Sequence, residues 1–371
     1  MKRNMIKLGD VATYINGYAF KPEDRGEVGL PIIRIQDLTG NAYDLGFYNG
    51  DYPKRIEIND GDVLISWSAS LGVYVWNRGR ALLNQHIFKV QFDKVNIDKS
   101  YFVYAVRQKL AEMAMKTHGA TMKHIVKKDF EETLIPYPSL KKQIEIGTNL
   151  DKIANIIVAR KQQLELLDEL VKARFVELFG DCNNLISMED VCSIITDGTH
   201  QPPKFQESGI PFILVSNLSN NTITYNTEKY ISEETYSALY KRTPIEIGDL
   251  LLSTVGSYGH PAVVTEDTRF LFQRHIAYLK PKREIVNSFY LHSALLAPDG
   301  QRQIEEKIKG IAQKTLNLSE IRKIMIPVPE IEEQNQFSDF VRAIDKSKVA
   351  IQKSLDETQI LFDSLMQKYF G

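Results

Sequence analysis

The chain has 371 residues, of which 43% are hydrophobic and 25% are charged, and its formal net charge is −1. These values are typical of a globular protein of two or three domains, and the neutral total disfavours a chain that binds nucleic acid unaided. No run approaches the ~20 apolar residues that span a bilayer, and two cysteines are too few for a zinc knuckle or a disulfide framework, so we expect a protein of the reducing cytoplasm.

The first 140 residues have a mixed pattern that is rich in strand signals. A Gly-Asp turn precedes the short apolar run Val63–Trp67, in which Trp67 is interpreted as a core residue, and Leu30–Ile35 also has the composition of a strand. Arg34 and Gln36 are spaced so that a strand would place both side chains on one face. If that face lies outside the core, it is a candidate binding surface.

Two segments, residues 141–179 and 332–370, contain no proline and have a heptad pattern that predicts long helices of roughly 50 Å. The apolar series of the first, with its polar interruptions, is Ile146, Leu150, Ile153, Ile157, Arg160, Leu164, Leu167, Val171, Arg174 and Leu178. The series of the second is Phe337, Val341, Ile344, Lys348, Ile351, Leu355, Thr358, Phe362, Leu365 and Tyr369.

A narrow apolar seam on a long helix needs a partner. We predict one antiparallel coiled coil between the two segments, because the first helix leads away from the first strand-rich segment and the second returns from the other. The alternative is that each helix packs on its own globular domain. The expected seam residues are Leu150, Ile153, Ile157, Leu164, Leu167, Val341, Ile344, Ile351, Leu355 and Phe362.

The chain is an internal repeat. Residues 119–180 align with 310–371 without a gap, and the strand signal Gly61–Ser66 recurs as Gly248–Ser253 among longer loops. Two diverged copies of one unit suggest a protein that contacts two similar targets, such as the half-sites of pseudo-symmetric DNA. The predicted organisation is a domain over 1–140, a helix over 141–180, a second domain over 181–330 and a second helix over 331–371.

No motif for catalysis is present. The chain has no Gly-x-x-x-x-Gly-Lys-Ser/Thr phosphate loop and no His-Glu-x-x-His zinc motif, and its seven histidines show no ligand spacing. An adenine methyltransferase needs an Asn/Asp-Pro-Pro-aromatic loop, and the nearest string, Gln201–Lys204, has the wrong ends. We therefore predict a chain without enzymatic activity, cofactor or metal.

Across its whole length, the sequence resembles the specificity subunit of Type I restriction–modification systems. The motifs occur in the same order in both copies, and that order carries the resemblance. The resemblance is carried by the duplicated domain-plus-helix unit, the strand signals above, and the loop Gly119–Ile125, which is followed by an Ile-Pro-x-Pro segment. The segment Ile194–Pro203 also looks like the opening of a recognition domain. The second copy of the loop, Gly310–Leu316, departs from the first, with Ala312 in place of Thr121.

The resemblance implies an α/β fold with two duplicated target-recognition domains, joined by two long antiparallel coiled-coil helices with pseudo-two-fold symmetry. It implies a subunit that reads a bipartite site on double-stranded DNA. Two modification subunits, which carry the S-adenosylmethionine chemistry, would dock on the helices, and restriction subunits would join the full complex. A related two-part restriction–methylation enzyme and a coiled-coil protein scaffold that never binds DNA remain as alternatives.

Polar side chains in the loops after the repeated strands, together with the basic stretch 113–128, are the expected DNA contacts, although a solvated loop also explains that stretch. In the first copy they are Lys21, Arg34, Gln36, Ser66, Ser68, Ser70, Asn84, Gln85, His86, Lys116, Thr121, Lys123 and His124. In the second they are Thr199, His200, Lys204, Ser216, Asn217, Ser253, Thr254, Ser257, Tyr258, Gln273, Arg274, His275, Gln313 and Lys314. The matched positions of His86 and His275 equally suit a shared core hydrogen bond.

Overall fold

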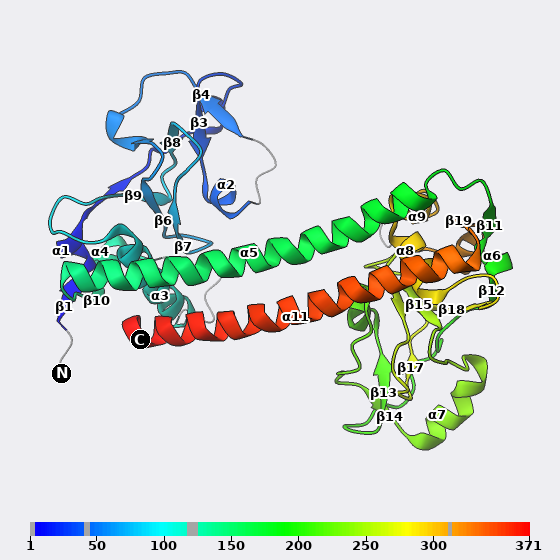
Figure 1. Cartoon of the computed structure of the whole chain (residues 1–371). Helices are drawn as coiled ribbons and strands as arrows, with labels where there is room; N and C mark the ends of the chain where they lie inside the picture. Colours follow the sequence, from blue (N-terminus) through cyan, green and yellow to red (C-terminus); the bar gives the residue numbers. More distant parts are fainter. Residues whose placement is uncertain (1–3, 41–44, 117–124, 311–313) are drawn as a thin grey trace. The chain divides into compact units, whose positions relative to one another are not determined.

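The computed structural model describes the chain except for residues 1–3, 41–44, 117–124 and 311–313 (Figure 1). The chain forms two compact units, one of Met1–Arg160 with Ser354–Gly371 and the other of Lys161–Lys353. Each unit therefore combines one strand-rich segment with a part of each long helix. Both units mix helices and sheets, which confirms the predicted α/β class.

The described residues of the first unit form two four-stranded sheets and a short two-stranded one. The first sheet has the order β2 (Thr13–Asn16), β9 (Ile87–Gln91), β6 (Val63–Ser66) and β7 (Gly72–Val75). The second has the order β4 (Gly46–Tyr48), β3 (Leu30–Ile33), β8 (Ala81–Leu83) and β5 (Glu57–Ile58), and the third pairs β1 (Met5–Lys7) with β10 (Leu134–Pro136). The helices are α1 (Leu8–Val11), α2 (Ile35–Thr39), α3 (Lys99–Lys116) and α4 (Lys127–Glu131), with 3-10 turns η1 (Pro22–Asp24) and η2 (Lys54–Ile56).

Among the described residues, the second unit has a four-stranded, a three-stranded and a two-stranded sheet. The first sheet has the order β12 (Cys192–Asp197), β18 (Ile276–Pro281), β15 (Leu250–Ser253) and β16 (Pro261–Val263). The second has the order β14 (Tyr230–Ile231), β13 (Ile210–Ile213) and β17 (Leu271–Phe272). The third pairs β11 (Leu185–Ser187) with β19 (Met325–Pro327). The helices are α6 (Met188–Val191), α7 (Glu233–Leu239), α8 (Ser288–Leu296), α9 (Pro298–Glu306) and α10 (Leu318–Ile321), with 3-10 turns η3 (Val215–Asn221) and η4 (Tyr240–Arg242).

The repeated Gly-Asp pair comes directly before a central strand in each unit, and its turn geometry explains this position. Gly61 and Gly248 have φ of 87° and 90°, in the left-handed region that favours glycine. The following carboxylates then turn back on the chain, so that Asp62 Oδ2 accepts the Asn59 N–H at 2.9 Å and Asp249 Oδ2 accepts the Glu246 N–H at 2.9 Å. The turn is closed before β6 and β15 begin.

The long helices extend over α5 (Leu140–Phe179) and α11 (Ile331–Phe370), within one residue of the predicted starts. In the second unit, Phe175 of α5 packs on Phe337 of α11 with ring centroids 5.5 Å apart, and Asp168 Oδ1 lies 2.5 Å from Lys348 Nζ. Residue numbers thus rise along one helix as they fall along the other. The predicted antiparallel pairing is confirmed.

In the first unit, α3 contacts the start of one long helix and the end of the other. The Tyr104 hydroxyl donates to Asp151 Oδ1 of α5 at 2.8 Å, and the Tyr104 ring lies 5.9 Å from that of Phe362 in α11. Of the predicted seam, five residues are buried: Leu150, Ile157, Val341, Leu355 and Phe362. The other five are half-buried: Ile153, Leu164, Leu167, Ile344 and Ile351.

A glutamine and a tyrosine at equivalent positions of the two copies make the same bonds next to the start of each long helix. Gln143 Oε1 accepts the Asp98 N–H at 3.0 Å, and Gln334 Oε1 accepts the Asn287 N–H at 2.9 Å. The Tyr101 hydroxyl donates to the Pro136 carbonyl at 2.8 Å, as the Tyr290 hydroxyl does to Pro327. Both glutamines are buried, so their bonds replace water and join the start of each long helix to the residue before α3 or α8. The tyrosine bonds join α3 to β10 and α8 to β19.

Two details differ from the sequence predictions. Arg34 and Gln36 do not lie on a strand, because β3 ends at Ile33 and the Arg34 backbone N–H donates to Asp37 Oδ2 at the start of α2. At the end of α5 the seam passes through Phe175 and Phe179, while Arg174 and Leu178 are exposed, since a straight helix drifts against a strict seven-residue repeat. In the second unit, α8 and α9 are separate helices, because Pro298 forces Ala297 into extended backbone (ψ 154°).

Candidate functional site

In the first unit, the carboxyl ends of β2, β3, β6 and β8 meet at one edge, because β3 and β8 are parallel and β2 and β6 both run antiparallel to β9. Backbone hydrogen bonds join the loops there, from the Tyr18 N–H to the Leu83 carbonyl at 2.8 Å and from the Asn84 N–H to the Ile33 carbonyl at 3.1 Å. We call this the loop edge. It consists of residues 16–21, 34–36, 66–70 and 84–86.

The second unit builds the same loop edge from residues 197–204, 214–217, 253–258 and 273–275. The Thr199 N–H donates to the Phe272 carbonyl at 2.9 Å, and the Gln273 N–H donates to the Ile213 carbonyl at 3.1 Å. These are the bonds of the first unit at equivalent positions.

Glycine is required at one position of each loop edge. A Cβ on Gly17 would lie 2.1 Å from the Asn84 carbonyl oxygen, and a Cβ on Gly198 would lie 2.2 Å from that of Phe272. Only glycine lets the loop after β2 or β12 approach the neighbouring strand so closely. Gly17 and Gly198 therefore mark equivalent places in the two copies.

In the first unit the predicted contact residues divide into an exposed and a buried set. Lys21, Ser70, Gln85 and His86 are exposed, Asn84 is half-buried, and Ser66 and Ser68 are buried. The Ser66 hydroxyl donates to the Ser70 carbonyl at 2.5 Å and thereby closes the loop from inside. Arg34 and Gln36 are half-buried, and the Arg34 guanidinium is held by Asp37 at 3.1 Å.

The second unit shows the same division. The exposed residues are His200, Lys204, Ser216, Ser257, Arg274 and Lys314, and the half-buried ones are Thr199, Tyr258, Gln273 and His275. The buried ones are Asn217, Ser253 and Thr254. Ser253 Oγ accepts the His260 N–H at 3.0 Å, and Asn217 Nδ2 donates to the Thr224 carbonyl at 3.0 Å. Predictions for Thr121, Lys123, His124 and Gln313, and for the side chain of Lys116, lie outside the described residues.

The two histidines at matched positions differ in their contacts. The His86 ring lies 5.4 Å from that of Trp67, and it is exposed. The Arg274 Nε donates to His275 Nε2 at 3.3 Å. Trp67 stacks on the buried ring of Phe88 with centroids 5.6 Å apart, so its ring covers the core from the loop edge.

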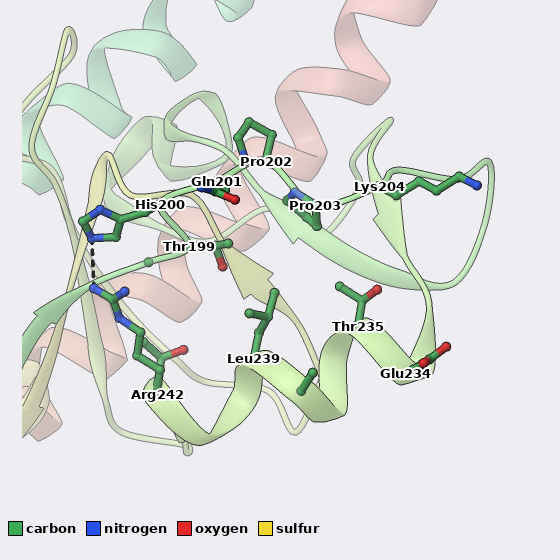
Figure 2. A pocket seen from close by; sticks show the side chains of 13 residues that line it. Thr199, His200, Gln201, Pro202, Pro203, Lys204, Glu234, Thr235, Leu239 and Arg242 are labelled. Carbon is green, nitrogen blue, oxygen red and sulfur yellow. Dashed lines mark hydrogen bonds between the residues drawn. The ribbon is translucent and has the colours of Figure 1, made fainter.

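A cavity of about 660 Å³ opens beside the loop edge of the second unit. Figure 2 shows it between the loop that carries His200 and Lys204 and the segment of α7 and η4. Its rim contains a charged group that the sequence analysis missed: Arg242 Nη2 lies 2.5 Å from Asp197 Oδ1 and 3.0 Å from His200 Nε2. The Asp197 Oδ2 oxygen lies 2.9 Å from the same histidine nitrogen.

A sequence signal for Arg242 did exist. The match between Gly61–Ser66 and Gly248–Ser253 extends backwards without a gap to Lys54-Arg55 and Lys241-Arg242. Both pairs lie in short 3-10 turns, η2 and η4. A dibasic pair kept in a 3-10 turn of both copies is a signal for contact with an anionic partner.

Other classes of site are not found in the described residues. No group of three or more His, Cys, Asp or Glu side chains that could hold a metal ion occurs among them. Nor does any helix in the described part of the chain have the length and apolar character needed to cross a membrane.

Comparison with known proteins identifies the family. The model for the Type I restriction modification DNA specificity domain matches twice, over residues 2–167 and 184–359. The Type I restriction enzyme EcoBI specificity subunit of Escherichia coli is 26% identical over 399 residues, covering 98% of this chain and 83% of that protein. The MjaVIII specificity subunit of Methanocaldococcus jannaschii is 22% identical over 367 residues, covering 92% and 85%.

Solved structures share the fold. The S subunit of a Type I restriction–modification system from M. genitalium aligns with a TM-score of 0.60 at 14% identity, covering 100% of this chain and 96% of that one. A chain from a study of Type I complex assembly aligns with a TM-score of 0.58 at 16% identity, covering 99% and 97%. With both halves matched by the same domain model, the chain belongs to the family of the Type I restriction modification DNA specificity domain.

Proposed function

We propose that this chain is the DNA sequence-specificity subunit of a Type I restriction–modification complex, and that each unit reads one half of a bipartite site. The observation that carries the proposal is the loop edge, which is built twice with the same hydrogen bonds but with different exposed side chains. A shared scaffold with varied loops suits two readers of two different sequences. Base edges would be contacted by side chains such as Gln85, His200 and Arg274, and phosphates by Lys21 and Lys204.

The catalytic steps belong to partner subunits in this proposal. The chain lacks the methyltransferase and ATPase motifs, so it positions partners on DNA and has no catalytic role itself. The site of action is accordingly the cytoplasm, where the DNA and these partners are found.

Exposed apolar residues on the long helices are the proposed docking surface for modification subunits. Val158 and Leu170 on α5 are 53% and 46% exposed, and their repeat equivalents Val349 and Leu361 on α11 are 71% and 50% exposed. Apolar side chains that remain exposed at equivalent positions of both helices suit two copies of one partner.

The test uses the gene in its native setting together with its partner genes. Methylome sequencing with and without the gene should show loss of methylation at one bipartite motif. In vitro, the complex should bind that motif with a steep dependence on salt, because phosphate contacts release counterions. Methyl transfer by the purified chain alone, or a methylome unchanged by deletion of the gene, would overturn the proposal. A protein scaffold would show no salt-dependent DNA binding.

A further inference from the structure

Arg242 belongs to one of the two dibasic turns. Among the cations of these turns, it is the one for which the described structure shows a contact with a carboxylate of the loop edge. Its side chain is 49% exposed, while that of Asp197, at the end of β12, is 19% exposed. The guanidinium therefore lies at the surface, and the less exposed Asp197 carboxylate accepts one of its Nη2 hydrogens. An arginine held in this way loses little side-chain freedom when it binds a ligand, and that lowers the entropic cost of recognition.

We propose that Arg242 reads a guanine in the second half-site, with Asp197 as its positioning residue. The inference rests on the proposed function and deepens it. Arginine pairs with guanine through two hydrogen bonds, to O6 and N7, from donors on two adjacent nitrogens. With a single Nη2 hydrogen committed to Asp197, the guanidinium keeps one complete two-donor edge for the base.

The tautomer of His200 determines whether the two-donor edge of the Arg242 guanidinium is available to a base. Its Nε2 lies within hydrogen-bond distance of both Asp197 Oδ2 (2.9 Å) and Arg242 Nη2 (3.0 Å), and it cannot donate to one and accept from the other at the same time. When Nε2 carries its proton, it donates to Asp197 and takes no hydrogen from Arg242. This tautomer leaves the arginine free to form both bonds to guanine.

The first copy offers a comparison within the chain. Arg55 of η2 is the repeat equivalent of Arg242, but Asn16 and Ala19 stand where the second copy has Asp197 and His200. Both Arg55 and Asn16 are exposed. The carboxylate that fixes the guanidinium is thus specific to the second unit, and base reading by this turn is assigned to the second half-site alone.

The rival role for Arg242 is a phosphate contact, and the two roles give different results. A base contact changes which sequences are recognised. A phosphate contact weakens binding to all sequences alike and lowers the slope of log K against log salt by about one.

The experiment uses the full complex with its modification subunits, the methylome as readout of sequence, and DNA-binding titrations as readout of salt slope. Arg242→Ala and Arg242→Lys should both make one G·C position of the second half-site degenerate, with discrimination at that pair lowered about 5- to 150-fold and the first half-site unchanged. Asp197→Asn, which installs the residue of the first copy, should lower the same discrimination by a smaller factor.

Lys241→Ala is the matched control, because it removes a neighbouring exposed charge from the same turn. It should leave every recognised base unchanged. The proposal is overturned if Arg242→Lys keeps full discrimination at every position, if Arg242→Ala only lowers the salt slope, or if the second half-site contains no G·C pair. A wild-type complex without any sequence-specific methylation would instead overturn the proposed function.

Discussion

The two cysteines lie in different environments. Cys192 is 4% exposed at the start of β12, and burial raises the pKa of its thiol to about 12. Cys182 is half-buried in the segment after α5. Because the thiolate is the reactive form, a thiol with a raised pKa stays neutral and unreactive near pH 8.

The expected result of thiol titration at pH 8 is one rapidly reacting cysteine in the native chain and two after unfolding in denaturant. Cys182→Ser should remove the rapid reaction and leave the slow one. A Cys192→Ser variant should keep the rapid reaction. Two rapidly reacting thiols in the native protein would contradict the burial of Cys192.

The sequence pointed to the loops that form the loop edge, but it did not show which of their side chains are exposed. Ser66 is the last residue of β6 and Ser70 lies four residues further along the chain, yet the first is buried and the second exposed. Their difference depends on how the loop folds back, which no local pattern encodes. Arg242 is a similar case, because its contact with Asp197 joins residues that are 45 positions apart.

The helices were the most predictable elements, because their periodic pattern is local and repeated over many turns. The strand segments were predicted where a turn signal preceded them, as at Gly61-Asp62. The prediction failed at Arg34, where a short helix follows β3 directly. There Asp37 accepts the Arg34 N–H at 2.8 Å, a capping bond that starts α2.

Seam positions on the long helices should differ in their contribution to stability according to burial. Leu355 is 8% exposed, Leu164 is half-buried, and Leu166 is 66% exposed. Leu355→Ala should lower the free energy of unfolding by about 2–5 kcal/mol, the range for a buried leucine. Leu164→Ala should cost less, and Leu166→Ala should remain within about 0.5 kcal/mol of the wild type.

Urea unfolding followed by circular dichroism measures all three variants, at one protein concentration and with unchanged m-values as the sign of a common unfolded state. The order of destabilisation is the critical result. If Leu166→Ala proved as destabilising as Leu355→Ala, the seam would not lie on the face given by the heptad pattern.

The proposed docking surface predicts a different outcome for exposed apolar positions of the same helices. Val158→Lys and Val349→Lys place a charge where an apolar contact with a partner is expected, so the double variant should lose binding of the modification subunit. Its own unfolding midpoint should change little, because both positions are more than half exposed. Lys152→Glu, at another exposed position of α5, is the control for charge alone. Pull-down of the modification subunit gives the readout, and full binding by the double variant would place the docking surface elsewhere.

At the scale of the whole chain, each compact unit of the structure combines one strand-rich segment with a part of each long helix. The sequence predicts a second domain over 181–330, and that boundary stays a prediction. The compact unit that contains this segment extends over Lys161–Lys353. The reason is a shared aromatic core in which Tyr290 of α8 lies 5.3 Å from Phe175 and 5.0 Å from Phe179, both on α5.

This difference makes a prediction about exchange of recognition units between family members. Exchanging residues 161–353 keeps the contacts of Phe175, Phe179 and Phe337 with Tyr290 in their original combination, while exchanging 181–330 places a foreign α8 against these three rings. The longer exchange should therefore give a complex with one new half-site, the other unchanged, and an unfolding midpoint close to that of the parents.

The shorter exchange should give the same change of half-site with a lower midpoint, because buried aromatic residues that no longer fit leave cavities or overlap. Introducing the donor's residues at positions 175, 179 and 337 into the shorter exchange should recover the lost stability. Methylome sequencing and thermal unfolding of the three chimaeras measure both effects. A change in both half-sites after either exchange would show that recognition is not divided between the two units.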